Sequence, residues 1–176
     1  LNPEADLPLA LKSGGNKLIW DMRYPGYKEF EGMVFYSSPN KGPKAIPGEY
    51  LISLNYNGEV IEQSLKIEKD PRLENTDKDY RDQFDFLINV RNQVTRANSA
   101  IIKIREVQKD LNYLKQKSGL TEEINNLINQ FEIKLSLIEN NIHMTKNQSR
   151  QDPLNYGIRI NNRIAFLLAD SQRGDY

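Results

Sequence analysis

The residues that could do chemistry in this chain are few, and their types and spacing match no catalytic motif. His143 is the only histidine, and it stands between Ile142 and Met144 at the expected end of a helix. A Ser-His-Asp triad would depend on it, and no G-x-S-x-G motif accompanies it. The chain has no cysteine, which excludes thiolate nucleophiles and thiolate zinc ligands. We therefore expect His143 at the surface, without a catalytic or metal-binding role.

Carboxylates are a second possibility, because a glycosidase needs only one pair of them. The chain has 24 Asp and Glu residues, so the existence of some pair carries no information. Asp77 and Asp79 are explained by a helix start, and Asp70, which precedes Pro71, is explained by a turn. The sequence therefore predicts no catalytic residue, no metal ligand and no cofactor.

Aromatic residues gather in the first forty positions: Trp20, Tyr24, Tyr27, Phe30, Phe35 and Tyr36. On an exposed face they could stack on sugar rings, whereas in a small domain they are more simply the core. Tyr27 and Phe30 lie in a glycine-flanked loop and are expected to be the most exposed of the set.

Three charged residues form a third candidate group. Asp21, Arg23 and Arg72 could make a ligand site, or they could form ion pairs that lock a strand to the junction between sheet and helix. Together with Trp20, Tyr24, Tyr27 and Phe30, they are the residues expected to determine the fold or an interaction.

These side chains must be positioned by two kinds of element, because the hydrophobic period changes at Asp70-Pro71-Arg72. Before that point apolar residues alternate. Strands are predicted at Leu7, Leu9 and Leu11, and over residues 16–24 and 33–36. Asn57-Gly58 predicts a type I′ turn between strands at 50–56 and 60–67. This pattern predicts a small immunoglobulin-like antiparallel β-sandwich over residues 1–72, possibly lacking a strand or two at its N-terminus.

Residues 73–176 are predicted to be helical. Thr76 begins a helix that continues to residue 117, with a heptad seam at Leu87, Val90, Val94, Ala97, Ile101, Ile104 and Leu111. A second apolar series follows at Ile124, Leu127, Ile128, Phe131, Leu135, Ile138 and Ile142. A shorter series starts at Ile160 and should return beside the first helix. The fold class is therefore α+β: a sandwich followed by a long antiparallel helical hairpin or three-helix bundle.

Composition restricts the classes of partner that we expect for this chain. The chain of 176 residues carries 24 basic and 24 acidic residues, and this neutrality argues against nucleic acid. No apolar run is long enough to span a membrane. Because the chain opens on Leu1 rather than Met, we expect it to be part of a longer protein.

An ordered series of motifs resembles a known family. It comprises Gly15-Asn16-Lys17-Leu18-Ile19-Trp20-Asp21-Met22-Arg23-Tyr24-Pro25-Gly26, Gly42-Pro43, Pro47-Gly48-Glu49-Tyr50, Asp70-Pro71-Arg72, residues 85–91 and Ile104-Arg105. Together they resemble the C-terminal region of exported bacterial proteins with sortilin-like, BNR-repeat β-propellers, often called glycosyl hydrolase-like. The resemblance covers residues 14–114 and, more loosely, 156–168.

The resemblance implies a non-catalytic accessory module that follows the β-propeller of the same chain and has a structural or protein-interaction role. It places the protein in the periplasm, outside the cell or at the outer membrane, and leaves open whether the parent protein is a hydrolase. The alternative is a carbohydrate-binding module that assists an upstream glycoside hydrolase. The partners implied are the propeller and possibly a protein or a glycan.

Overall fold

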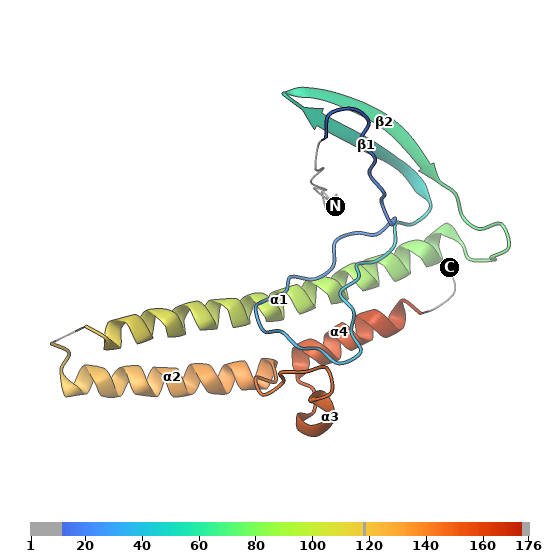
Figure 1. Cartoon of the computed structure of the whole chain (residues 1–176). Helices are drawn as coiled ribbons and strands as arrows, with labels where there is room; N and C mark the ends of the chain where they lie inside the picture. The colour runs from blue at the N-terminus through green and yellow to red at the C-terminus, as the bar shows by residue number, and fades with distance from the viewer. Residues whose placement is uncertain (1–11, 118, 174–176) are drawn as a thin grey trace.

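Helices dominate the structure, a computed structural model that describes residues 12–117 and 119–173. They are α1 (Asp77–Lys115), α2 (Glu122–Ile142), the short α3 (Pro153–Tyr156) and α4 (Ile160–Ser171). A hairpin of β1 (Gly48–Tyr56) and β2 (Glu59–Ile67) precedes them. Figure 1 shows α2 and α4 following one another beside α1, so these three helices form one layer.

The helix α1 begins where its capping residues dictate. The Thr76 hydroxyl accepts a hydrogen bond from the Asp79 backbone N–H at 3.3 Å, and the Asp79 carboxylate accepts one from the Thr76 N–H at 2.8 Å. This reciprocal capping box satisfies backbone donors that have no partner within the helix. Neither Pro nor Gly interrupts the next 39 residues, which span about 58 Å. The predicted long helix is confirmed.

Both α2 and α4 run antiparallel to α1. Two contacts fix α4: Asn161 Nδ2 lies 3.1 Å from Asn98 Oδ1, and Gln83 Nε2 lies 3.3 Å from the Ser171 carbonyl oxygen. The return of the last helix beside the first is therefore confirmed. Polar contacts join α1 to α2, namely Arg105–Glu139, Gln108–Ser136 and Lys115–Glu132.

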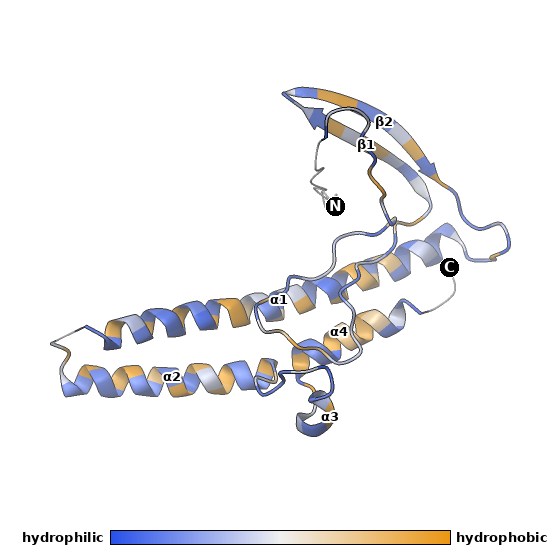
Figure 2. Ribbon diagram, in the orientation of Figure 1, coloured by the Kyte–Doolittle hydropathy of each residue, from blue (hydrophilic) through white to orange (hydrophobic). Residues whose placement is uncertain are grey.

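These polar contacts change the orientation predicted for α2. Ile128 and Glu139 are buried toward α1, whereas Leu127, Phe131 and Ile138 are 52%, 57% and 50% exposed. The apolar series of α2 therefore divides between the helix contact and an open surface. Figure 2 shows apolar residues recurring along both helices.

The β1–β2 hairpin is confirmed. Asn57 and Gly58 have φ values of 51° and 85°, the positive values that a type I′ turn requires at both central positions. Pairing of Tyr56 with Glu59 closes the hairpin, and the register runs without a bulge to Gly48 and Ile67.

The immunoglobulin-like β-sandwich predicted for residues 1–72 is wrong. The only sheet within residues 12–117 and 119–173 has two strands, β1 and β2. Residues 16–24 alternate and residues 33–36 form a short apolar run, both typical of strands, but their backbones make other hydrogen bonds. A single antiparallel bridge pairs Arg23 with Lys44, and an asparagine side chain of α4 binds Tyr36. The strand predicted at Leu7, Leu9 and Leu11 lies outside the described residues.

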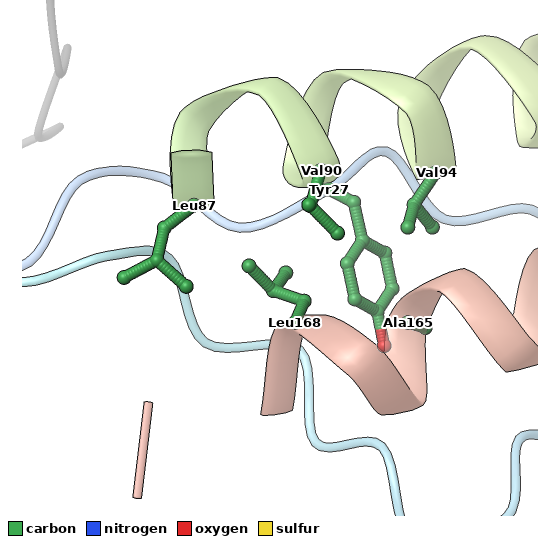
Figure 3. Close-up of a cluster of buried hydrophobic side chains, with 6 residues drawn as sticks. All are labelled: Tyr27, Leu87, Val90, Val94, Ala165 and Leu168. Carbon is green, nitrogen blue, oxygen red and sulfur yellow. The ribbon is translucent and has the colours of Figure 1, made fainter. Parts of the chain in front are cut away.

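Instead of a sandwich, residues 22–45 form an extended loop across α1 and α4, which we call the strap (Figure 1). Its Tyr27 is only 3% exposed and enters the main apolar core, whose other buried members are Leu87, Val90, Val94, Ala165 and Leu168. Figure 3 shows the Tyr27 ring between Val90 and Val94 of α1 and Ala165 of α4. The residues before position 72 therefore complete the core of the helices after it.

The two limbs of the strap approach too closely for a side chain at Gly42. A Cβ atom there would lie 1.9 Å from the Tyr24 carbonyl oxygen. Between the limbs, the Asn40 side chain accepts from the Tyr27 N–H and donates to its carbonyl, each at 2.8 Å. An asparagine amide thus does here what a neighbouring strand would do.

None of the described helices combines the length and the apolar character needed to cross a membrane.

Candidate functional site

The strongest concentration of buried polar groups lies where the strap meets the helices. We call Asn98, His143, Asn161 and Asn162 the polar cluster; they are 0%, 2%, 0% and 3% exposed. Asn98 lies in the middle of α1, His143 is the C-cap of α2, and the two other asparagines lie in the first turn of α4. The ends of α2 and α4 therefore bring together residues that are distant in sequence.

Hydrogen bonds connect the polar cluster internally. Asn161 Nδ2 lies 3.1 Å from Asn98 Oδ1 and 3.3 Å from His143 Nδ1. Asn161 Oδ1 accepts from the Asn162 backbone N–H at 2.8 Å. Because buried amides are costly without partners, this network specifies how the three helices meet.

The same asparagines hold the strap. Asn98 Nδ2 donates to the Lys28 carbonyl at 2.7 Å. Asn162 binds both backbone groups of Tyr36, accepting from its N–H at 2.8 Å and donating to its carbonyl at 3.1 Å. Asn162 Nδ2 also lies 3.0 Å from Ser38 Oγ. The polar cluster thus replaces a β-ladder for the strap.

His143 is enclosed by aromatic rings rather than by acids. Phe30 meets its ring edge-on at 4.9 Å between centroids, and Phe35 lies at 6.2 Å. Burial, and next the nearby Arg105 charge, hold the pKa of His143 below its usual value of 6.5, against smaller opposing effects of Glu139 and Asn161. The neutral imidazole is therefore favoured in the fold.

An ion pair borders the polar cluster. Arg105 Nε lies 2.8 Å from Glu139 Oε1, and Arg105 Nη1 donates to the Glu31 carbonyl of the strap at 2.6 Å. The Arg105 guanidinium also stands 4.8 Å from the centre of the Phe30 ring. This arginine therefore ties α2 and the tip of the strap to α1.

The chemistry available to this site is limited by its partners. No carboxylate is hydrogen-bonded to His143 among the described contacts, and Ser38 is engaged with Tyr36 and Asn162. Across residues 12–117 and 119–173, no group of three or more His, Cys, Asp or Glu side chains could hold a metal ion. Hollows elsewhere on the described surface include one on α2 beside Ile133 and Leu137 and one of about 110 Å³ between Ala45, Ile67 and Tyr80. The hydrogen bonds of the polar cluster thus clamp the strap to α1 and α4.

The structure separates the predicted charged group. Asp21 Oδ1 accepts from the Arg23 backbone N–H at 3.0 Å, a local turn contact. The Arg23 guanidinium donates to the Gly42 carbonyl and to Gln172 Oε1, each at 2.7 Å, so it joins the base of the strap to the end of α4. Arg72 forms an exposed bidentate pair with Asp70. The described contacts bring no shared ligand site together from these residues.

The aromatic residues divide differently from the prediction. Tyr27, expected to be exposed, is the most buried of them, and its hydroxyl donates to the Ser38 carbonyl at 2.8 Å. Phe30 is half-buried between Arg105 and His143. Tyr24 packs on Phe84 of α1 with 4.9 Å between ring centres. Trp20 is half-buried, with its ring 6.1 Å from Tyr50 and its Nε1 donating to the Arg23 carbonyl at 3.0 Å.

Sequence reasoning missed the polar cluster. His143, expected at the surface, is buried, and the three asparagines received no role. One signal was present: Asn98 adjoins Ala97 on the apolar face of the long helix, and Asn161 and Asn162 interrupt the start of the last apolar series. Buried amides in such places are retained only when they are hydrogen-bonded.

No protein-family model, curated protein or solved structure matches this chain.

Proposed function

We propose that this chain is a non-catalytic accessory module with a structural or protein-interaction role. One observation supports this most: the buried polar cluster is occupied in clamping the strap, while large apolar side chains remain exposed. Leu127, Phe131 and Ile138 of α2 and Leu54 and Ile61 of the hairpin are between 46% and 63% exposed. Open apolar surface of this extent is typical of proteins that contact other proteins.

We also propose the domain context and location that the resemblance implies. In that setting the chain follows a sortilin-like β-propeller in an exported bacterial protein, located in the periplasm, outside the cell or at the outer membrane. The amphipathic hairpin, with apolar residues on one face of both strands, then offers a second surface for contact with the neighbouring domain.

Binding to the neighbouring domain tests the interaction role. The chain is titrated with the separately purified segment encoded directly upstream, and heat is measured by calorimetry. We expect binding, weakened by Ile61→Glu on the apolar face of the hairpin and unaffected by Glu62→Gln on the other face. An upstream segment without propeller repeats, or one that does not bind, would overturn this setting.

A second assay separates the proposal from its alternatives. The chain is screened against a glycan array and against a panel of chromogenic glycosides, and we expect neither binding nor hydrolysis. Glycan binding lost in Trp20→Ala would instead identify a carbohydrate-binding module. Hydrolysis that survives repurification and is lost in Glu139→Gln would identify an enzyme.

A further inference from the structure

The strap crosses one face of the helical layer (Figure 1). Along α1, the strap contacts residues that each lie one position after a residue facing α2 or α4: Phe84, Arg91, Thr95, Asn98 and Arg105. These five residues recur at helical spacing and therefore mark one face of the layer.

A set of exposed apolar residues lies on the opposite side. Near the free end of the α1–α2 hairpin, six of them each precede by one position a residue that faces the other helix, whereas Ile133 and Leu137, which are 62% and 60% exposed, follow such residues and lie on the other side of α2. We call these six the tip face: Val107 and Leu114 of α1, and Ile124, Leu127, Phe131 and Ile138 of α2. Their exposed fractions range from 37% to 57%. Figure 1 shows this end of the hairpin extending beyond both the strap and α4.

The two rows of the tip face lie on one side of the hairpin. An approximate two-fold axis, perpendicular to the plane of both helices, relates the two members of an antiparallel pair. We call the row of residues on each helix that faces the other helix the contact line. Residues that precede the contact line by one position on either helix therefore lie on the same face of the pair. The Arg105–Glu139 and Gln108–Ser136 contacts fix the antiparallel register. The tip face is therefore continuous across α1 and α2 and lies opposite the strap.

The size of the tip face suits a small specific interface. Residues 122–139 span about 26 Å, and two helices are about 20 Å wide, which gives about 500 Å² per partner. Two such faces bury about 1,000 Å² in total, the lower limit for a biological contact.

We infer that the tip face binds the tip face of a second copy of this chain, forming an antiparallel four-helix bundle. A two-fold axis parallel to the helices places α1 of one copy over α2 of the other, so that all neighbouring helices run antiparallel.

The charges favour this arrangement. Asp110 and Lys134 also lie one position before the contact line, and the Gln108–Ser136 contact places them level with each other. The two-fold axis brings Asp110 of each copy beside Lys134 of the other. The chain has 24 basic and 24 acidic residues, so no net charge opposes self-association.

This inference deepens the proposed function by naming a partner for its open surface. The test is sedimentation velocity of the full chain over a concentration series up to about 1 mM. We expect a concentration-dependent species of twice the 20.4 kDa chain mass. Leu127→Glu should raise the dissociation constant at least about ten-fold. Leu137→Glu is the matched control, because Leu137 is 60% exposed on the same helix but lies off the tip face.

A charge exchange tests the predicted geometry. Asp110→Lys should weaken the dimer, and adding Lys134→Asp should restore it. Circular dichroism confirms that each variant remains helical, and Phe131→Glu replaces Leu127→Glu if that variant unfolds. A chain that stays monomeric throughout would overturn the inference, as would a dimer weakened by Leu137→Glu but not by Leu127→Glu. Neither result would bear on the glycan and hydrolysis assays, which test the proposed function separately.

Discussion

Removal of the Tyr27 side chain should be the most damaging single change in the strap. Tyr27 is 3% exposed among side chains of α1 and α4, so Tyr27→Ala loses a buried aromatic ring, which costs about 3–5 kcal/mol. The lost hydrogen bond to the Ser38 carbonyl adds about 1 kcal/mol. Tyr27→Phe keeps the ring and should cost only about 1 kcal/mol.

Urea unfolding followed by circular dichroism measures these costs. With a slope of about 2 kcal/mol per molar urea, a loss of 4 kcal/mol lowers the midpoint by about 2 M. Trp20→Ala is the comparison, because Trp20 is only half-buried and should cost about 2 kcal/mol. If Trp20→Ala destabilised the chain more than Tyr27→Ala, the strap would not contribute to the core in the way described.

Three further predictions concern the clamp. Because burial lowers the pKa of His143 below 6.5, the unfolded chain takes up this proton first, so the free energy of unfolding should fall as pH drops from about 6.5 toward 5. Urea titrations at both pH values test this. If the free energy of unfolding of His143→Gln depended on pH as strongly as that of the unchanged chain, the prediction would be contradicted. Gly42→Ala should lower the free energy of unfolding by at least about 2 kcal/mol, because its Cβ would overlap the Tyr24 carbonyl. Gly15→Ala meets open space and should be neutral, and thermal melts of both variants test this. A double-mutant cycle of Arg105→Met and Glu139→Gln should give a coupling energy of about 1–3 kcal/mol, and a value near zero would refute the proposed tie between α1 and α2.

Elements with local signals could be predicted from the sequence. The Asn57-Gly58 turn needs positive φ at adjacent residues, and the Thr76 cap and heptad lie within a few residues of the structure they specify. These signals act over one turn or one hairpin. They therefore gave the β1–β2 hairpin and the long helix correctly.

The strap could not be predicted because its partners are distant. Residues 33–36 are a short apolar run typical of a strand, yet Asn162, 126 positions after Tyr36, supplies the backbone hydrogen bonds. Such a run shows that a segment can be extended, but it does not show what covers it. Tyr27 reads as a loop residue between glycines, and only the groove between α1 and α4 explains its burial.

The candidate site was missed for a related reason. His143 lies near a helix end beside Met144 and Lys146, and this local context predicts a surface position. Its burial arises from Phe30 of the strap and Asn161 of α4, which meet only when all three segments have folded. The reverse error affected α2. Its apolar residues predicted one buried apolar face, but the polar residues Glu132 and Glu139 face α1.

Native-state hydrogen exchange of the full chain tests most directly whether strap and helices share one core. The backbone amide of Tyr36, bound to Asn162 Oδ1, should exchange with the same free energy of opening as the amides around Val94 in α1, and Tyr27→Ala should lower both together. Rapid exchange at Tyr36 while the middle of α1 stays fully protected would contradict this account.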